Sequence, residues 1–181
     1  MSTRPKNPVR ILLAVLAAAV AVAAAVPAVA AEVRVAGEAG ARTLEVDGRP
    51  MMVFGMNWDH VPIGENYMWS LWMQPDDVIQ VALDRDMPLL QAMHVNAIRQ
   101  YNGIPPRWVK YIYEKYGIWT IINHPMARYG YTLDGVWIPS VDYSDPKLRA
   151  AVKAEILALV DEFRGTPGML MWLLGNENNY G

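Results

Sequence analysis

The chain has 181 residues, a formal net charge of −2 and no cysteine. The small net charge, with no basic run after residue 10, argues against a nucleic-acid partner. Without disulfides, an exported domain must be stabilised by its hydrophobic core alone, which suits a larger domain better than a small cross-linked one.

The first thirty residues have the pattern of a secretory signal peptide. Basic residues within positions 4–10 precede an Ala-, Val- and Leu-rich run over 11–26, which Pro27 and the small-x-small sequence Ala28-Val29-Ala30 follow. An uncleaved membrane anchor is the alternative, because the run approaches the ~20 apolar residues of a membrane span. We expect residues 1–30 to be removed, leaving a protein that is exported to the periplasm or the extracellular space and has no stable membrane insertion.

Short strands are predicted next. Residues 32–37 alternate weakly between apolar and polar, and the segments 43–46 and 49–56 flank an Asp47-Gly48 turn, which predicts a β-hairpin. The run 51–56 is apolar without alternation, as in a strand buried on both faces. Residues 31–50 are therefore assigned to an N-terminal strand and hairpin, and residues 51–181 to the main domain.

From residue 74 onward, helical patterns alternate with short apolar strands. The first expected helix runs from Gln74-Pro75-Asp76-Asp77 to Leu90 and is kinked or split at Pro88, and a strand over 95–99 follows it. The second helix begins at Pro105-Pro106 and stops at Gly117, before a strand over 118–122 and a loop over 124–143. The third helix has Asp145 as N-cap and Pro146 in its first turn, ends at Gly165 and precedes a strand over 169–174.

This order implies parallel strands joined by right-handed crossovers, and so an α/β fold. An open doubly wound sheet and a (β/α)8 barrel both fit the order, but no glycine-rich turn follows the first strand, as a dinucleotide-binding fold requires. A whole barrel needs ~250 residues. The pattern therefore predicts the N-terminal half of a (β/α)8 TIM barrel, strands 1 to 4, preceded by a short β-hairpin and the signal peptide.

Polar residues follow each of the four apolar strands. They are Asn57-Trp58-Asp59-His60, Arg99-Gln100-Tyr101-Asn102, Asn123-His124 and Asn176-Glu177-Asn178-Asn179. In a barrel these strand ends meet at one face, where directional donors and acceptors suit a polyhydroxylated ligand. The histidines and acids lack metal-ligand spacing, so we expect no metal and no cofactor. No Gly-x-Ser-x-Gly elbow and no thiol nucleophile are present in the sequence.

The sequence Trp172-Leu173-Leu174-Gly175-Asn176-Glu177 resembles the fourth-strand signature of the large clan of (β/α)8 retaining glycosidases. The hairpin leading into Gly55-Met56-Asn57-Trp58 is most similar to family 2 glycoside hydrolases, and Arg85 to Leu90 followed by Asn96-Ala97-Ile98-Arg99 to family 72 glucanosyltransferases.

The resemblance implies that Glu177 is the general acid and base and that Asn176 hydrogen-bonds the sugar 2-hydroxyl. It also implies that Arg99 supports the nucleophile carboxylate, which in the clan ends the seventh strand. This sequence contains no seventh strand. Asn57, Trp58 and His124 are further candidates for substrate binding, although His124 could instead shape a turn and Trp58, like Trp137, could instead pack in the core.

The sequence therefore predicts a retaining glycoside hydrolase acting on an oligo- or polysaccharide. This chain carries the acid/base half of the site, lacks the nucleophile and is expected to be inactive alone. Three alternatives stay open: a transglycosylase, a non-catalytic carbohydrate-binding half barrel that pairs with a copy of itself or with a partner chain, and a secreted α/β binding protein without sugar chemistry.

Overall fold

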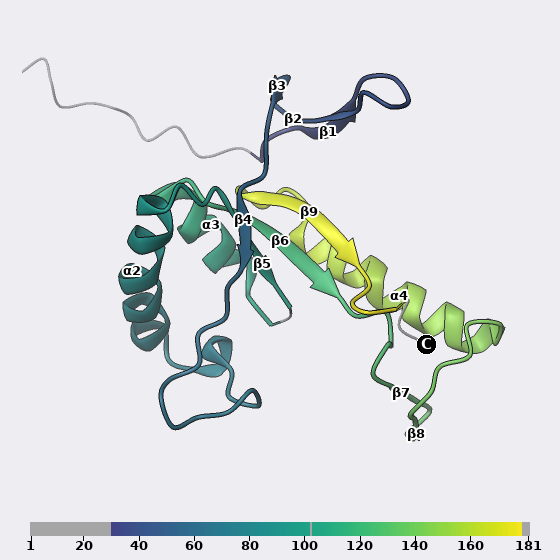
Figure 1. Ribbon diagram of the computed structural model, residues 1–181. Helices are drawn as coiled ribbons and strands as arrows, with labels where there is room; N and C mark the ends of the chain where they lie inside the picture. The colour runs from purple at the N-terminus through teal and green to yellow at the C-terminus, as the bar shows by residue number, and fades with distance from the viewer. Residues whose placement is uncertain (1–29, 102, 179–181) are drawn as a thin grey trace, which may run out of the picture.

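The computed structural model describes residues 30–101 and 103–178 and is built around a sheet of four parallel strands (Figure 1). In their order across the sheet these are β4 (Gly55–Asn57), β5 (Ala97–Gln100), β6 (Trp119–His124) and β9 (Met169–Leu174). The predicted parallel α/β sheet is therefore confirmed, and its closure into a barrel stays a prediction. The predicted signal peptide lies outside the described residues except for Ala30.

Three helices connect these strands. They are α2 (Asp76–Ala92), which follows the short 3-10 helix η1 (Leu71–Met73), then α3 (Pro106–Tyr116) and α4 (Pro146–Phe163). Among the described residues, no helix has the length and apolarity that crossing a membrane requires. The β, α, β order read from the sequence is thus the order of the elements in space.

Local capping signals explain where the helices begin and end. Asp145 accepts hydrogen bonds from the backbone N–H groups of Lys147 and Leu148, at 2.8 and 3.3 Å, and Pro146 occupies the first turn of α4. Gly117 ends α3 in the left-handed conformation, with a φ of 67°, which glycine adopts without a steric penalty. The expected kink at Pro88 does not divide α2, which continues through it as one helix.

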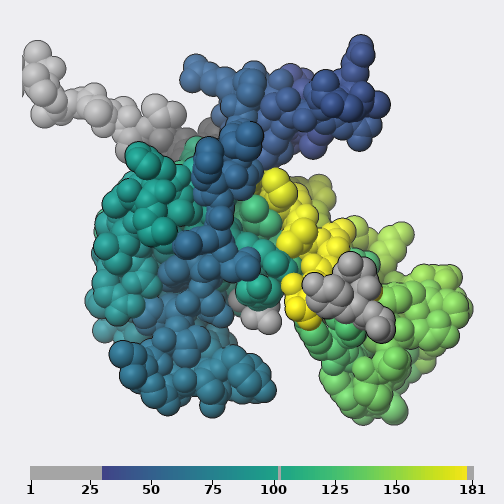
Figure 2. Space-filling view, in the orientation of Figure 1, coloured from purple at the N-terminus to yellow at the C-terminus, as the bar shows by residue number. Residues whose placement is uncertain are grey.

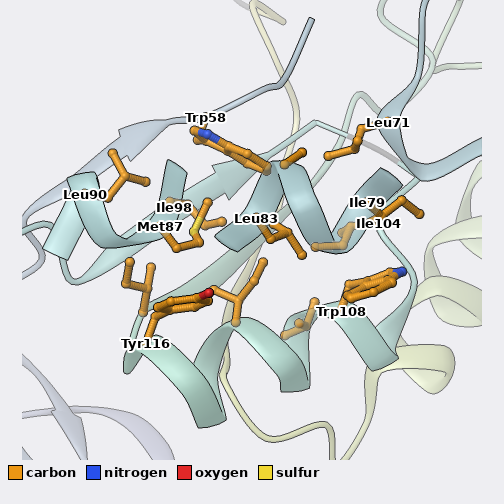
Figure 3. Close-up of a cluster of buried hydrophobic side chains, with 14 of the residues drawn as sticks. Trp58, Leu71, Ile79, Leu83, Met87, Leu90, Ile98, Ile104, Trp108 and Tyr116 are labelled. Atoms are coloured by element: carbon orange, nitrogen blue, oxygen red, sulfur yellow. The ribbon is translucent and has the colours of Figure 1, made fainter. Parts of the chain in front are cut away.

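The main core lies between the sheet and helices α2 and α3. Figure 3 shows Leu83 and Met87 of α2 opposite Tyr116 of α3, with Ile98 of the sheet beside them. Leu83, Met87 and Ile98 are completely buried. Burial of such side chains contributes roughly 1.5–3 kcal/mol each to folding, so this layer fixes how α2 and α3 lie on the sheet.

The N-terminal strands form a separate antiparallel sheet of β1 (Val33–Ala36), β2 (Thr43–Val46) and β3 (Arg49–Pro50). Its turn at Asp47-Gly48 has positive φ at both residues, 49° and 73°, as the Asp-Gly prediction requires. Leu44, Val46 and Val53 pack with buried Ala97 and Trp119, on the sheet face away from the main core. This small sheet therefore covers part of the second face of the central sheet.

Two predictions about the strands were wrong in detail. The run 51–56 is not a doubly buried strand, because Met52 and Phe54 are 73% and 64% exposed and the strand begins only at Gly55. The second arm of the hairpin is likewise shorter than predicted, ending at Pro50. The predicted strands at 95–99 and 118–122 begin one or two residues later in the structure and end one or two residues later.

The expected loop over 124–143 contains an antiparallel hairpin of β7 (Tyr131–Leu133) and β8 (Val136–Ile138). Its tip, Asp134-Gly135, again has positive φ at both residues, 51° and 79°. This Asp-Gly pair is the same turn signal as at Asp47-Gly48, and it marks the hairpin that the sequence analysis missed.

A polar cluster joins the outer surfaces of α2 and α3. Asp84 accepts hydrogen bonds from Lys115 at 2.8 Å, from the Tyr111 hydroxyl at 2.5 Å and from the Tyr116 hydroxyl. The hydrogen bonds from Lys115, Tyr111 and Tyr116 hold the pKa of Asp84 well below its usual range. Burial, together with the bond to Asp84, raises the pKa of Tyr116 to about 12.

We expect Asp84→Asn to lower the free energy of unfolding by about 1–2 kcal/mol at neutral pH, since it removes the charge that three donors share at a partly exposed site. Because the folded state depresses the pKa of Asp84, its contribution is present above the unfolded value of about 3.9 and is lost as pH falls further. Urea unfolding of both proteins should therefore show a difference that shrinks below pH 4. The exposed variant Asp161→Asn is the control and should change stability little.

Candidate functional site

Strand register brings three polar side chains to one face of the central sheet, the face away from α2 and α3. Asn57 pairs with Arg99 across β4 and β5, Arg99 pairs with Ile121 across β5 and β6, and Asn123 lies two residues beyond Ile121. Paired residues share a face in a parallel sheet, and alternate residues of one strand do so as well. Asn57, Arg99 and Asn123 therefore lie together at the carboxyl ends of their strands.

Arg99 links this face to the end of β9. Its Nη2 donates to Oδ1 of Asn123 at 2.6 Å and to Oδ1 of Asn176 at 2.7 Å. The guanidinium also lies over the ring of Tyr101, with Cζ 4.6 Å from the ring centroid. Arg99 thus holds the ends of β5, β6 and β9 in one arrangement, and the sequence-predicted pair Arg99 and Asn176 is in direct contact.

Glu177 joins the same network through the loop that follows β6. The Tyr129 hydroxyl donates to Oε2 of Glu177 at 3.1 Å and accepts a hydrogen bond from Nδ2 of Asn176. Nε of Arg128 donates to the backbone carbonyl of Glu177 at 2.7 Å. Two neighbouring residues of one loop therefore fix both the side chain and the backbone of Glu177, whose carboxyl group stays exposed to solvent.

The turn that carries Glu177 has an unusual backbone. Glu177 has a φ of 57° and Gly175 a φ of 116°. The side chain of Asn178 closes the turn by accepting from the N–H of Asn176 at 2.6 Å, and a Cβ on Gly175 would lie 2.6 Å from that same oxygen. A left-handed glutamate costs of order 1–3 kcal/mol, and such outliers gather at functional sites.

His124 lies on the opposite face of the sheet from Asn123, because successive side chains of a strand alternate. Its Nδ1 accepts a hydrogen bond from the N–H of Met126 at 3.0 Å, and its Nε2 lies 3.4 Å from a carboxylate oxygen of Glu155 on α4. It lines an open cavity of about 520 Å³ beneath α4. These contacts favour the turn-shaping interpretation of His124.

Trp58 is 7% exposed and belongs to the main core, as Figure 3 shows. Its ring meets that of Trp72 edge-on, with centroids 6.2 Å apart, and its Nε1 donates to Oδ2 of Asp86 at 3.3 Å. Burial raises the pKa of Asp86, but hydrogen bonds from Arg85, His60 and Trp58 outweigh it and leave the pKa below its ordinary value. The arrangement favours the core interpretation of Trp58.

The site therefore brings together Arg99, Asn176 and Glu177, with Asn57 on the same face. Sequence reasoning missed Asn123, Arg128 and Tyr129 as its partners. Strand alternation from Arg99 could have identified Asn123, whereas nothing in the loop sequence marks Tyr129.

Figure 2 shows a hollow between the segment around residues 60–73 and the β7–β8 hairpin, below these strand ends. Within the described parts of the chain, no group of three or more His, Cys, Asp or Glu residues could hold a metal ion.

Comparison with known proteins finds sequence similarity to beta-galactosidases and a fold similar to part of a beta-glucuronidase. No family model matches the chain. The chain is 23% identical over 141 residues to "Beta-galactosidase 2" of Enterobacter cloacae and 24% identical over 140 residues to a beta-galactosidase of Klebsiella pneumoniae (strain 342). Each alignment covers 76% of this chain and 12% of the relative, so the chain spans about an eighth of the length of the curated relatives it matches.

The fold matches part of a solved structure of Parabacteroides merdae beta-glucuronidase with glycerol in its active site, with a TM-score of 0.51, 15% identity, and coverage of 83% of this chain and 16% of that chain. A second structure of the same enzyme gives a TM-score of 0.50. The chain is thus a distant homologue of beta-galactosidases. This agrees with the resemblance to family 2 glycoside hydrolases seen in the sequence.

Proposed function

We propose that this chain supplies the acid/base half of the active site of a retaining glycoside hydrolase. The observation that carries the proposal is the hydrogen-bonded group of Arg99, Asn176, Tyr129 and Glu177 beyond the carboxyl ends of three parallel strands. In parallel α/β barrels, catalytic residues lie at these strand ends. The distant homology to beta-galactosidases supports the same reaction class.

Glu177 is the proton donor to the glycosidic oxygen in this proposal, and afterwards the base that activates water. Its carboxyl group is open to solvent, and the Tyr129 hydroxyl holds Oε2 in a defined direction. A general acid must lie within hydrogen-bond reach of the oxygen it protonates, so a fixed direction matters. Asn176 binds a sugar hydroxyl beside it, with its side chain oriented by Arg99 on one side and by Tyr129 on the other.

The nucleophile has to come from outside this set of residues. A retaining mechanism needs a second carboxylate ~5–5.5 Å from the acid/base. Among residues 30–101 and 103–178, no carboxylate forms an ion pair with Arg99. We propose that the second carboxylate ends a later strand and accepts from the guanidinium of Arg99, whose planar donors suit a carboxylate. Export, read from residues 1–30, belongs to the same proposal.

The first test is sugar binding by the chain itself. We expect methyl β-D-galactopyranoside, at millimolar concentrations, to shift the NMR signals of the Arg99, Asn123 and Asn176 side chains saturably. Asn176→Ala should weaken this binding at least about fivefold, because a group that hydrogen-bonds a ligand contributes roughly 1 kcal/mol or more. Glu155→Gln, on helix α4 at the other face of the sheet, is the control and should leave binding unchanged. Shifts at His124 without shifts at Arg99 would contradict the proposed site.

A non-catalytic carbohydrate-binding role is the second candidate, favoured by the same lack of a carboxylate partner for Arg99 in the described residues. The gene separates the two candidates. A reading frame that continues past the codon for Gly181 into an apolar strand ending in glutamate would support hydrolysis. A stop codon directly after Gly181 would leave binding as the function of this polypeptide.

A further inference from the structure

The β7–β8 hairpin is fixed to the protein through one of its faces. Tyr131 and Leu133 pack against a cluster of Ala127, Leu148 and Val152, which anchors the hairpin to α4. At its tip, Asp134 forms an ion pair with Lys147. Trp137 pairs with Thr132, which lies between Tyr131 and Leu133 in the strand. Since side chains alternate along a strand, Trp137 is on the face away from the anchor.

Trp137 is exposed and yet held in one position. Its side chain is 59% exposed, which is unusual for the largest apolar side chain. The edge of its indole ring lies directly on Gly130, where a Cβ would come within 2.2 Å of the ring, and Gly130 has a φ of 105°. Only glycine permits this contact. The ring is therefore positioned by the backbone beneath it, while much of its surface stays open to solvent.

This ring packs on the same loop that holds the proposed acid/base. Gly130 directly follows Tyr129, whose hydroxyl donates to Glu177, and Arg128 donates to the Glu177 backbone. The short segment 128–130 therefore contacts Glu177 at one end and Trp137 at the other. Figure 1 shows the hairpin beyond the carboxyl ends of β6 and β9, on the side where the proposed site opens.

We propose that Trp137 forms a binding subsite for the sugar unit on the leaving-group side of the scissile bond. This inference rests on the proposed function, because a general acid protonates the oxygen that joins the two sugars. A platform carried by the loop that orients this acid lies beside the departing sugar. The ligand class is a β-linked pyranose whose apolar face of C–H groups stacks on an aromatic ring, while its hydroxyl groups stay in water.

Two matched pairs of sugars test the proposal on the full chain: lactose with methyl β-D-galactopyranoside, and cellobiose with methyl β-D-glucopyranoside. We expect the disaccharide of at least one pair to bind about five- to tenfold more tightly than its methyl glycoside, the gain of one stacked ring. The indole N–H signal of Trp137, identified by its loss in Trp137→Ala, should shift with the disaccharide and not with the methyl glycoside.

Variants then separate the platform from the rest of the site. Trp137→Ala should remove the tighter binding of the disaccharide and leave the affinity for the methyl glycoside unchanged. Trp137→Phe should keep part of the tighter binding of the disaccharide. Gly130→Ala should act like Trp137→Ala, because a Cβ displaces the ring without removing it. Equal unfolding midpoints would show that Trp137→Ala and Trp137→Phe are folded, whereas Gly130→Ala should have a lower midpoint, because alanine is strained at a φ of 105°, and should still unfold cooperatively.

Two results would overturn the inference in distinguishable ways. If methyl glycosides shift Arg99 and Asn176 while disaccharides bind no better and the Trp137 indole does not move, the subsite is wrong and the proposed function stands. If neither kind of sugar shifts Arg99 or Asn176, the proposed function fails, and the subsite fails with it.

Discussion

Glu177→Gln should reduce kcat/KM for alkyl β-glycosides by about 10²- to 10⁴-fold in an enzyme that joins this chain to the second carboxylate. Glutamine keeps the size of the side chain and can still meet the Tyr129 hydroxyl, but it has no proton to give to the leaving oxygen. The loss should be much smaller for nitrophenyl glycosides, since a nitrophenolate leaves without being protonated. Comparing kcat/KM for the two substrate types therefore reports the acid step itself, because kcat/KM does not include the later attack of water, in which Glu177 acts as the base.

The matched control for this experiment is Glu155→Gln, the same chemical change at an exposed glutamate of helix α4. It should leave kcat/KM for both substrate types unchanged. Equal losses of kcat/KM for alkyl and nitrophenyl glycosides in Glu177→Gln would mean that Glu177 positions the substrate and is not the acid. No loss for either would remove Glu177 from the mechanism.

The second large effect is expected from Arg99→Ala. The variant leaves Oδ1 of Asn123, a residue that is only 3% exposed, and Oδ1 of Asn176 without their donor. Orphaned buried acceptors cost about 1–3 kcal/mol each, so we expect a loss of roughly 2–3 kcal/mol in the free energy of unfolding, measured in urea. Binding of methyl β-D-galactopyranoside should fall at least about tenfold, because Asn176 is no longer oriented.

Arg107→Ala provides the control, since Arg107 is 60% exposed and pairs with exposed Asp76. Surface pairs contribute ~0–1 kcal/mol, so its effect should be small. Arg99→Lys should recover part of the stability and little of the binding, because an ammonium group lacks the planar fork of donors. Full recovery of both by lysine would show that only the positive charge matters.

Local signals predicted the helices and the order of strands well. Asp145 with Pro146, and Gly117, act through the backbone of their own turn, so their effect is readable without knowing the neighbours. The burial of a strand depends on what packs against it. Met52 and Phe54 have the composition of a doubly buried strand but lie in the segment before the edge strand β4, where they are exposed.

The difference between local signals and signals that depend on packing also explains which residues of the candidate site could be predicted. The position of Asn176 and Glu177 at the end of a strand was predictable because only Gly175 separates them from an apolar strand whose bounds, Met169–Leu174, are the expected ones. Choosing Asn123 over His124 required aligning β6 with β5, because alternation along β6 identifies the face of Asn123 only once the register with Arg99 is known. Tyr129 reaches Glu177 across 48 residues of chain, through a loop whose course only the folded structure defines.

At Glu177 the left-handed backbone lowers conformational stability, while the proposed acid/base role requires a glutamate at the same position. Asparagine and glycine adopt this conformation more readily than glutamate does. A search for stabilising substitutions, by selection for heat resistance or by sequence design on this backbone, would therefore favour replacing Glu177. The improved melting temperature of such a protein would come with the loss of the proposed proton donor, so thermal screening of this chain needs an assay of sugar binding or hydrolysis beside it.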